Sequence, residues 1–403
     1  MPWQDFFRKA LTIHVNLSVL VWMVSFLCLL WVAFGNVRDN FLDKAALIFC
    51  IFGTIIFSIS PFLGSGEALL NNYVPIFDNK IFLIGISIFA GGAILQLFLL
   101  LVRLIMRRNP FSSDIEFGVY SSSLIVAMAV LCLFWSFLKL SAENGAEVLT
   151  RQGYFEILFW GGGHVLQLAY TQLTLIAWLW LSSALGLNLT SKKWVKPLLL
   201  SLGVIMAIPS PYVYFRYEIT DPFYIEFFSK QMQHGAGIAA GIFSVLVIFA
   251  FLRKKQKTTL IPERNCLLWS IALFGIGDIL GFLISGINVT IPAHYHGSIV
   301  GVTLALMGLT YNLLPRLGFS DAPIRISSIQ PHIYGIGQLM HIIGLAWSGG
   351  YGVLRKTPGA METIEAKISM GLMGAGGMLA IIGGLLFVIA AFTSVTKSPI
   401  RRS

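Results

Sequence analysis

Long apolar stretches separated by short polar segments make up most of this chain. A helix rises about 1.5 Å per residue, so roughly 20 apolar residues cross the hydrocarbon core of a bilayer, which is about 30 Å thick. The pattern therefore predicts an all-α fold, a polytopic membrane bundle of about eleven transmembrane helices. The predicted spans cover residues 11–34, 45–64, 80–106, 119–141, 154–186, 195–216, 229–252, 265–288, 292–314, 331–351 and 369–395.

Composition supports a membrane protein and narrows its domain organisation. Hydrophobic residues make up 56% of the chain and charged residues only 11%, which is typical of helical membrane bundles. The segments between the predicted spans are short, and the two longest outer ones, residues 141–151 and 354–368, are too small to fold alone. We predict that residues 1–403 form a single integral-membrane domain.

The charges of the connecting segments predict an orientation in the membrane. Alternate segments collect most basic residues on one face, for example Arg107, Arg108, Lys254 and Lys255, while most acidic loop residues gather on the other. By the positive-inside rule the basic face is cytoplasmic, which places the N-terminus outside and the C-terminus inside a prokaryotic-type cytoplasmic membrane. Because the basic residues are scattered, the net charge of +10 does not indicate a nucleic-acid partner.

The four cysteines predict packing roles and no covalent haem. All of them fall inside predicted spans, and no Cys-x-x-Cys-His motif for haem attachment is present in the sequence. No two cysteines are close enough in sequence to suggest a binuclear copper site. The cysteines are Cys28, Cys50, Cys132 and Cys266.

The histidines carry the strongest chemical signal. A titratable side chain inside a bilayer is costly and therefore indicates function, and imidazole is a common axial ligand of haem iron. His294 and His296 are two residues apart, so on a helix they point in roughly opposite directions and can each bind a different cofactor. With the orientation above, His14, His164 and His234 lie at the same outer depth. We predict a layer of five imidazoles near the outer surface.

Other polar residues inside the spans have less specific interpretations. We interpret His332 and His341 as structural, although His341, near mid-membrane, is also a candidate for lining a site. Asp278 is the clearest intramembrane carboxylate, and it indicates either a proton path or a buried partner for a polar group. The sequence provides no chain of such groups from the cytoplasmic side, so proton pumping is not predicted.

Several of these segments, in order, resemble the catalytic subunit I of haem-copper oxidases. Residues 288–317, which contain Ile-Pro-Ala-His-Tyr-His-Gly, are similar to helix ten of that family, closest to its B and C families and the nitric oxide reductases. Residues 331–350 resemble the helix that follows, residues 11–17 resemble helix two, and residues 162–165 resemble helix six. The likeness covers nearly the whole chain, and the usual first helix of the family is missing.

The resemblance implies a role for each outer histidine. His14 and His296 would be the two axial ligands of a low-spin haem, and His294 would bind the high-spin haem where a small gas binds. His164 would bind the second metal, which is copper in the oxidases and iron in the nitric oxide reductases. Two haems, expected to be b-type, follow from this, with His294 and His164 as the catalytic residues. Arg355 and Lys356 resemble the basic pair that receives haem propionates, or are ordinary loop residues.

The chain departs from the family pattern at the second metal. The family carries two adjacent histidines in helix seven, whereas residues 208–217 contain no histidine here. Four residues after His164, where the oxidases have tyrosine and the reductases glutamate, the chain has Leu168. One imidazole is a poor copper site, which makes copper or non-haem iron doubtful. His234 is either a displaced ligand or a polar residue beside a haem. Three nearby tyrosines either hydrogen-bond a bound ligand or belong to the membrane interface, namely Tyr212, Tyr214 and Tyr217.

Two functions follow from the resemblance. The first is an oxidoreductase that passes electrons through the low-spin haem to the high-spin haem, which reduces nitric oxide or dioxygen. The alternative is a non-catalytic haem subunit that transfers electrons or senses a gas within a larger respiratory complex. A third function is a transporter without cofactors, in which the histidines would be proton relays or packing residues. The resemblance argues against it, because the similar segments follow the order of the family's helices. We expect membrane lipid, a small gas ligand and an accessory redox subunit of cytochrome c or cupredoxin type as partners.

Overall fold

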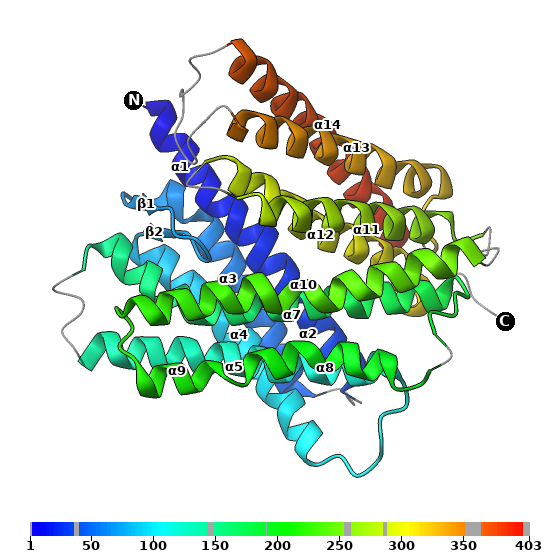
Figure 1. Cartoon of the computed structure of the whole chain (residues 1–403), viewed down its shortest axis with the longest axis horizontal. Coiled ribbons are helices and arrows are strands. Elements are labelled where there is room, and N and C mark those ends of the chain that lie inside the picture. Colours follow the sequence, from blue (N-terminus) through cyan, green and yellow to red (C-terminus); the bar gives the residue numbers. More distant parts are fainter. Residues whose placement is uncertain are drawn as a thin grey trace. The chain divides into compact units, whose positions relative to one another are not determined.

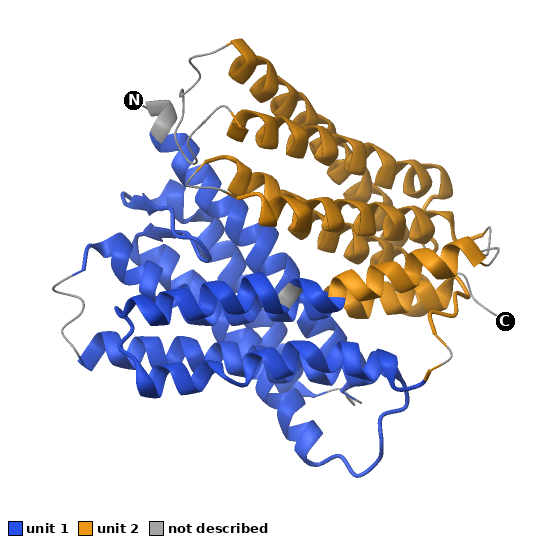
Figure 2. Cartoon of the chain, viewed as in Figure 1, with its two compact units in different colours: residues 1–173, 193–239 blue, residues 174–192, 240–403 orange. Residues whose placement is uncertain are grey.

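The computed structural model describes residues 2–35, 40–142, 149–190, 192–253, 259–284, 288–350 and 364–397. The chain divides into two compact units, which Figure 2 shows in different colours. Unit 1 comprises residues 1–173 and 193–239, and unit 2 comprises residues 174–192 and 240–403. The single-domain organisation expected from the sequence stays a prediction.

Unit 1 consists of helices and one small hairpin (Figure 1). The helices α7 (Arg151–Ala184) and α10 (Pro222–Arg253) each contribute residues to both units. The other elements of unit 1 among the described residues are α1 (Pro2–Val15), a π-helix (Asn16–Val21), α2 (Trp22–Phe34), α3 (Phe41–Leu63), β1 (Glu67–Leu69), β2 (Ile76–Asp78), α4 (Lys80–Ile105), α5 (Asp114–Ala142), α8 (Val195–Ala207) and α9 (Ser210–Arg216).

In the described part of unit 2, four further helices pack against one another. The helix pairs α11–α12 and α13–α14 make the most extensive contacts within this unit. Their bounds are Ile261–Phe282 for α11, Thr290–Arg316 for α12, Ile324–Gly350 for α13 and Ile364–Thr396 for α14.

Ten segments of the described chain are long and apolar enough to cross a membrane, which confirms the polytopic helical fold. The chain is an integral membrane protein. The first span, Asp5–Phe34, runs through α1, the π-helix and α2. The predicted span over residues 331–351 is helical through residue 350, where α13 ends, but it is less apolar than the ten segments above. His332 and Gln338 contribute to this difference.

Glycines allow neighbouring helices to approach closely in both units. In unit 1, a Cβ atom built on Gly85 of α4 would lie 2.5 Å from the backbone nitrogen of Phe57 in α3. In unit 2, a Cβ atom on Gly337 of α13 would lie 2.5 Å from the backbone nitrogen of Ala380 in α14. Any larger residue would force these backbones apart. Small residues at the contact are how membrane helices gain packing in the absence of a hydrophobic driving force.

The hairpin between α3 and α4 was not predicted from the sequence. Strands β1 and β2 pair antiparallel, with Ala68 opposite Phe77. The Asn79 side chain caps the start of α4 by accepting a hydrogen bond of 2.7 Å from the backbone N–H of Ile81. Apolar side chains of the hairpin join a buried cluster with residues of α3, α4 and α7. Its buried members are Phe57, Leu69, Ile76, Phe77, Phe82 and Phe155.

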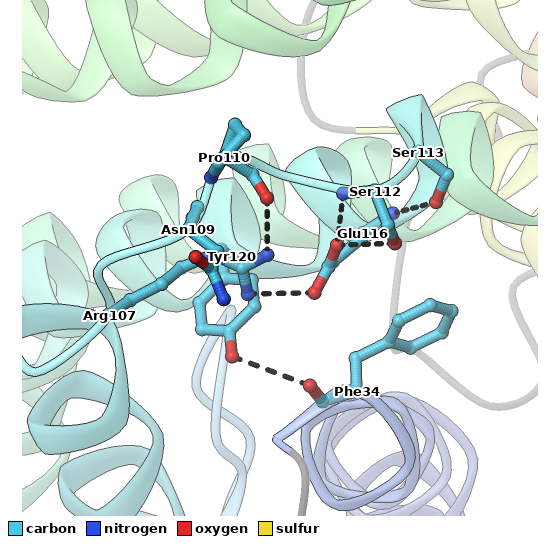
Figure 3. Close-up of polar contacts among 8 residues, drawn as sticks. All are labelled: Phe34, Arg107, Asn109, Pro110, Ser112, Ser113, Glu116 and Tyr120. Atoms are coloured by element: carbon cyan, nitrogen blue, oxygen red, sulfur yellow. Dashed lines mark hydrogen bonds and ion pairs between the residues drawn. The ribbon is translucent and has the colours of Figure 1, made fainter.

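A partly buried ion pair fixes the loop between α4 and α5 (Figure 3). The guanidinium group of Arg107 donates to a carboxylate oxygen of Glu116 at 2.8 Å. It also donates to the carbonyl groups of Asn109 and Pro110. The second carboxylate oxygen of Glu116 accepts from the backbone N–H of Ser112 at 2.6 Å and from its hydroxyl at 2.7 Å. The hydrogen bond that Arg107 donates to Glu116 raises the pKa of Arg107, so this cation stays charged.

Candidate functional site

His164 lies on α7 in unit 1, where it is only 2% exposed. Its Nδ1 is 2.7 Å from the carbonyl oxygen of Trp160, one turn earlier, and its Nε2 is 2.7 Å from the hydroxyl of Tyr73. A carbonyl oxygen only accepts, so Nδ1 carries the ring proton and Nε2 accepts the hydrogen bond from the phenol. Both nitrogens of this imidazole are therefore engaged.

Tyr73 reaches His164 from the turn of the hairpin. Its ring centroid lies 4.7 Å from the His164 ring and 6.2 Å from the Trp160 ring. The approach requires glycine at position 163, because a Cβ atom there would overlap the Tyr73 ring. Sequence reasoning missed Tyr73. The run Gly161-Gly162-Gly163 before the histidine was the available signal, since it indicates a close approach without naming the partner.

Phenols occupy the region where the helix-seven histidines were expected. Tyr214 of α9 and Tyr224 of α10 are fully buried, and their hydroxyl oxygens lie 3.0 Å apart. Ser136 of α5 joins them at 2.9 Å from the Tyr214 oxygen. Phe228 connects this cluster to the site, since its ring centroid lies 6.1 Å from that of His164. Tyr214 thus hydrogen-bonds other side chains, in line with a polar role and against a membrane-interface role.

The other two tyrosines from this region lie elsewhere. Tyr212 is 64% exposed, as expected for a residue at a membrane interface. Tyr217 stacks on Phe223 with ring centroids 4.2 Å apart. His234, on α10, is exposed. Among the described residues, no three or more His, Cys, Asp or Glu side chains gather in a metal-binding group.

His14 lies in the last turn of α1, one residue before its end at Val15, and the π-helix follows from Asn16. Two residues later, the amide nitrogen of Asn16 donates to the carbonyl of Thr12 at 2.9 Å and to the carbonyl of Pro75 in the hairpin at 2.7 Å. Ser18 donates to the carbonyl of His14 at 2.7 Å. Single π-helical turns occur frequently at functional sites because they rotate the side chains on either side of them. The His14 side chain itself is exposed, beside the wider turn and the buried Asn16.

His294 lies in the first half of α12, in unit 2, against α11. Its Nδ1 is 2.7 Å from the carbonyl oxygen of Gly277, so Nδ1 carries the proton and Nε2 has the lone pair. Among the described residues Nε2 has no hydrogen-bond partner. The helices cross where Gly277 meets Gly297, since a Cβ atom on Gly277 would overlap the backbone of Ser298. Gly281 borders the imidazole, because a Cβ atom there would lie 2.8 Å from Nδ1.

His296 faces another helix of unit 2. Its ring centroid lies 4.6 Å from that of His341 on α13, with the ring planes at 62°. The two histidines of the His-Tyr-His sequence therefore contact different helices, as the i, i+2 spacing predicts. The sequence did not single out His341 as a neighbour of His296. Its own Nδ1 lies 3.0 Å from the carbonyl oxygen of Met373 on α14.

The predicted layer of five imidazoles stays a prediction. His14, His164 and His234 belong to unit 1, whereas His294 and His296 belong to unit 2, and each is described within its own unit. Arg355 and Lys356, the predicted propionate pair, lie outside the described residues. Asp278, next to Gly277 on α11, is partly buried.

Sequence comparison decides the family. Cytochrome c and quinol oxidase polypeptide I, a family of membrane subunits of oxidase complexes, matches residues 1–386. The chain belongs to this family. The subunit I resemblance drawn from the helix-ten segment is thereby confirmed, and family membership implies haem cofactors.

Two relatives of this subunit I chain cover most of its length. An uncharacterized protein of Rickettsia prowazekii (strain Madrid E) is 31% identical over 447 residues, which cover 96% of this chain and 87% of that protein. An uncharacterized protein of Aquifex aeolicus (strain VF5) is 28% identical over 324 residues, which cover 78% of this chain and 76% of that protein. The similarity to both therefore extends over most of the helical chain.

Proposed function

We propose that this chain is a haem-binding, electron-transferring member of the subunit I family that works without the second metal of the gas-reducing centre. One observation carries the proposal. His164 matches the family's second-metal ligand. Its Nδ1 donates a hydrogen bond to the carbonyl of Trp160, and its Nε2 accepts one from the phenol of Tyr73. In this state the lone pair of Nε2 is already used by the hydrogen bond from the Tyr73 phenol.

The surrounding donor set argues in the same direction. Copper and non-haem iron need several nitrogen, sulfur or carboxylate donors held in a defined geometry. Neutral phenols and a serine hydroxyl line this part of unit 1, and each hydroxyl is already hydrogen-bonded within the cluster of Ser136, Tyr214 and Tyr224. The residues therefore do not fit a second metal, and we favour electron transfer over reduction of nitric oxide or dioxygen.

His294, in contrast, fits haem iron. An iron-ligating imidazole usually donates its other ring N–H to a carbonyl or carboxylate, which fixes the tautomer and the ring orientation. The carbonyl of Gly277 does this for His294, and Gly281 leaves one side of the ring without a side chain. His294 would hold one haem through Nε2, and His14 and His296 would hold the second. Bound haem supplies a reversible one-electron iron centre, and the protein tunes it through ligand, burial and hydrogen bonds.

The route of the electrons completes the proposal. With the N-terminus outside and the C-terminus in the cytoplasm, the histidines of the predicted layer lie near the outer surface. An accessory redox subunit of cytochrome c or cupredoxin type would deliver electrons there, within a larger respiratory complex in the lipid bilayer. A gas that binds the His294 haem would be sensed or held without being reduced, because the proposed site has no second metal to take part in its reduction.

Metal analysis with optical spectroscopy of the purified full chain tests the proposal. We expect two b-type haems per chain and less than stoichiometric copper or non-haem iron. His294→Ala should lose the high-spin haem, whereas the matched variant His234→Ala should keep both. A full equivalent of copper or non-haem iron that disappears in His164→Ala would contradict the electron-transfer proposal. A protein without haem would contradict it as well.

A further inference from the structure

His341 contacts His296, yet the subunit I resemblance gives it no role. We infer that His341 is a positioning residue that fixes the plane of the His296 imidazole and thereby tunes the haem that His296 binds. The inference rests on the proposed haem ligation by His296. It concerns residues of α12, α13 and α14 alone, all within unit 2.

The first step is the close approach of α13 and α14. A Cβ atom on Gly344 of α13 would lie 2.5 Å from the backbone nitrogen of Met373 and from the carbonyl oxygen of Ser369. A Cβ atom on Gly376 of α14 would lie 2.5 Å from the backbone nitrogen of His341. Glycine at both positions brings the two backbones into direct contact. The hydroxyls of Ser348 and Ser369, 2.7 Å apart, form a hydrogen bond across the same contact between α13 and α14.

The second step is the hydrogen bond that this contact permits. The carbonyl of Met373 lies 3.0 Å from Nδ1 of His341, within reach only because the helices are so close. Since a carbonyl accepts, Nδ1 carries the proton, and rotation of the ring would break the bond. Gly377 borders the same nitrogen, because a Cβ atom there would lie 3.4 Å away. The His341 ring is therefore fixed in both tautomer and orientation.

The third step is the contact through which the fixed His341 ring restricts the orientation of the His296 ring. The two ring centroids are 4.6 Å apart and the planes meet at 62°, an edge-to-face contact that disfavours rotation of the His296 ring. Residues behind a metal ligand commonly set its orientation, and their substitution changes the properties of the metal. The plane of an axial imidazole determines its overlap with the iron d orbitals. His341 is thus placed to influence the spectrum and potential of the haem bound by His296.

Low-spin electron paramagnetic resonance and redox titration of full-length His341→Phe test the inference. Phenylalanine keeps a ring of similar size but loses the donor to Met373. We expect the largest g value and the midpoint potential of the low-spin haem to shift, with unchanged haem content and an unchanged high-spin haem. The same substitution at His332, on the same helix, serves as the matched control and should shift neither.

The outcomes separate this inference from the proposed function. Unchanged g values and potential in haem-loaded His341→Phe would overturn the positioning role while leaving the haem ligation intact. Complete loss of the low-spin signal would make His341 a ligand itself and would also overturn the positioning role. If His341→Phe does not fold, His341→Asn, whose amide can donate to the Met373 carbonyl but lacks a ring, should give the same shift. A wild-type protein that lacks a low-spin haem would instead refute the proposed function.

Discussion

The hydroxyl of Tyr73 lies 2.7 Å from Nε2 of the buried His164. Tyr73→Phe would keep the ring packing and remove only the donor, leaving a buried acceptor without its partner. An unsatisfied buried group costs about 1–3 kcal/mol, so we expect the free energy of unfolding to fall by about that amount. Thermal unfolding of the detergent-purified protein measures this.

A matched substitution controls for the loss of a phenol in general. Tyr212 is 64% exposed, and Tyr212→Phe should change the free energy of unfolding by less than about 0.5 kcal/mol. If both variants unfold at the wild-type temperature, the Tyr73–His164 hydrogen bond does not stabilise the protein. The conclusion that Tyr73 occupies Nε2 of His164 would then be wrong.

Gly163→Ala tests whether Tyr73 occupies the position described. A methyl group at residue 163 would overlap the Tyr73 ring, so the hairpin turn must shift and the phenol must leave His164. We expect a loss of about 1–3 kcal/mol, the usual cost of overpacking. Gly91 of α4 has open space around it, and Gly91→Ala should be neutral or stabilise the helix by up to about 1 kcal/mol. If the packing is as described, thermal unfolding shows a lower unfolding temperature for Gly163→Ala and no decrease for Gly91→Ala.

Gly281→Ala tests whether the close contact of Gly281 with the His294 ring positions this imidazole. The added methyl would lie 2.8 Å from Nδ1, so the imidazole must move and the bond to the Gly277 carbonyl must weaken. Loss of such an orienting bond typically lowers metal affinity 10–100-fold. We expect reduced occupancy of the high-spin haem by optical titration with added haem. Gly275→Ala, on the same helix with open space around it, should retain wild-type affinity, and equal affinity of both variants would contradict the role of Gly281.

Glu116→Gln tests the ion pair of the α4–α5 loop. The substitution removes the charge that faces Arg107 and one of the two carboxylate oxygens, of which one accepts from Arg107 and the other from Ser112, in a site where Glu116 is only 7% exposed. We expect a loss of about 1–3 kcal/mol in the free energy of unfolding. The exposed pair of Glu226 and Lys230 is the control, since surface ion pairs contribute about 0–1 kcal/mol. A Glu116→Gln protein no less stable than Glu226→Gln would show that the partly buried pair adds nothing.

The spanning helices were predictable because membrane insertion requires about 20 apolar residues, and such runs are visible in a single sequence. The span over residues 331–351 shows where this signal weakens, since it contains polar side chains such as His332 and Gln338. Just before it on α13, the side-chain oxygen of Gln330 accepts a hydrogen bond from Tyr311. The hairpin was missed because its strands have three residues each, too short for an alternating pattern to be recognised.

The candidate site was predictable only in part. The spacing of His294 and His296 follows from helical periodicity, so their different neighbours could be anticipated. Tyr73 could not, because the residue that meets His164 comes from a loop 91 positions away. His341 is another case: its contact with His296 depends on how closely α13 and α14 approach, which glycine content suggests but does not specify.

The hairpin links two histidines that lie far apart in the sequence. The carbonyl of Pro75 accepts a hydrogen bond from Asn16, two residues after His14. The hydroxyl of Tyr73 donates a hydrogen bond to Nε2 of His164. A change in the length or register of this short segment between two spans would therefore reach both imidazoles at once. Under the proposed function, the surroundings of both histidines could be retuned here without altering the spanning helices, and substitution of Tyr73 could open His164 to metal.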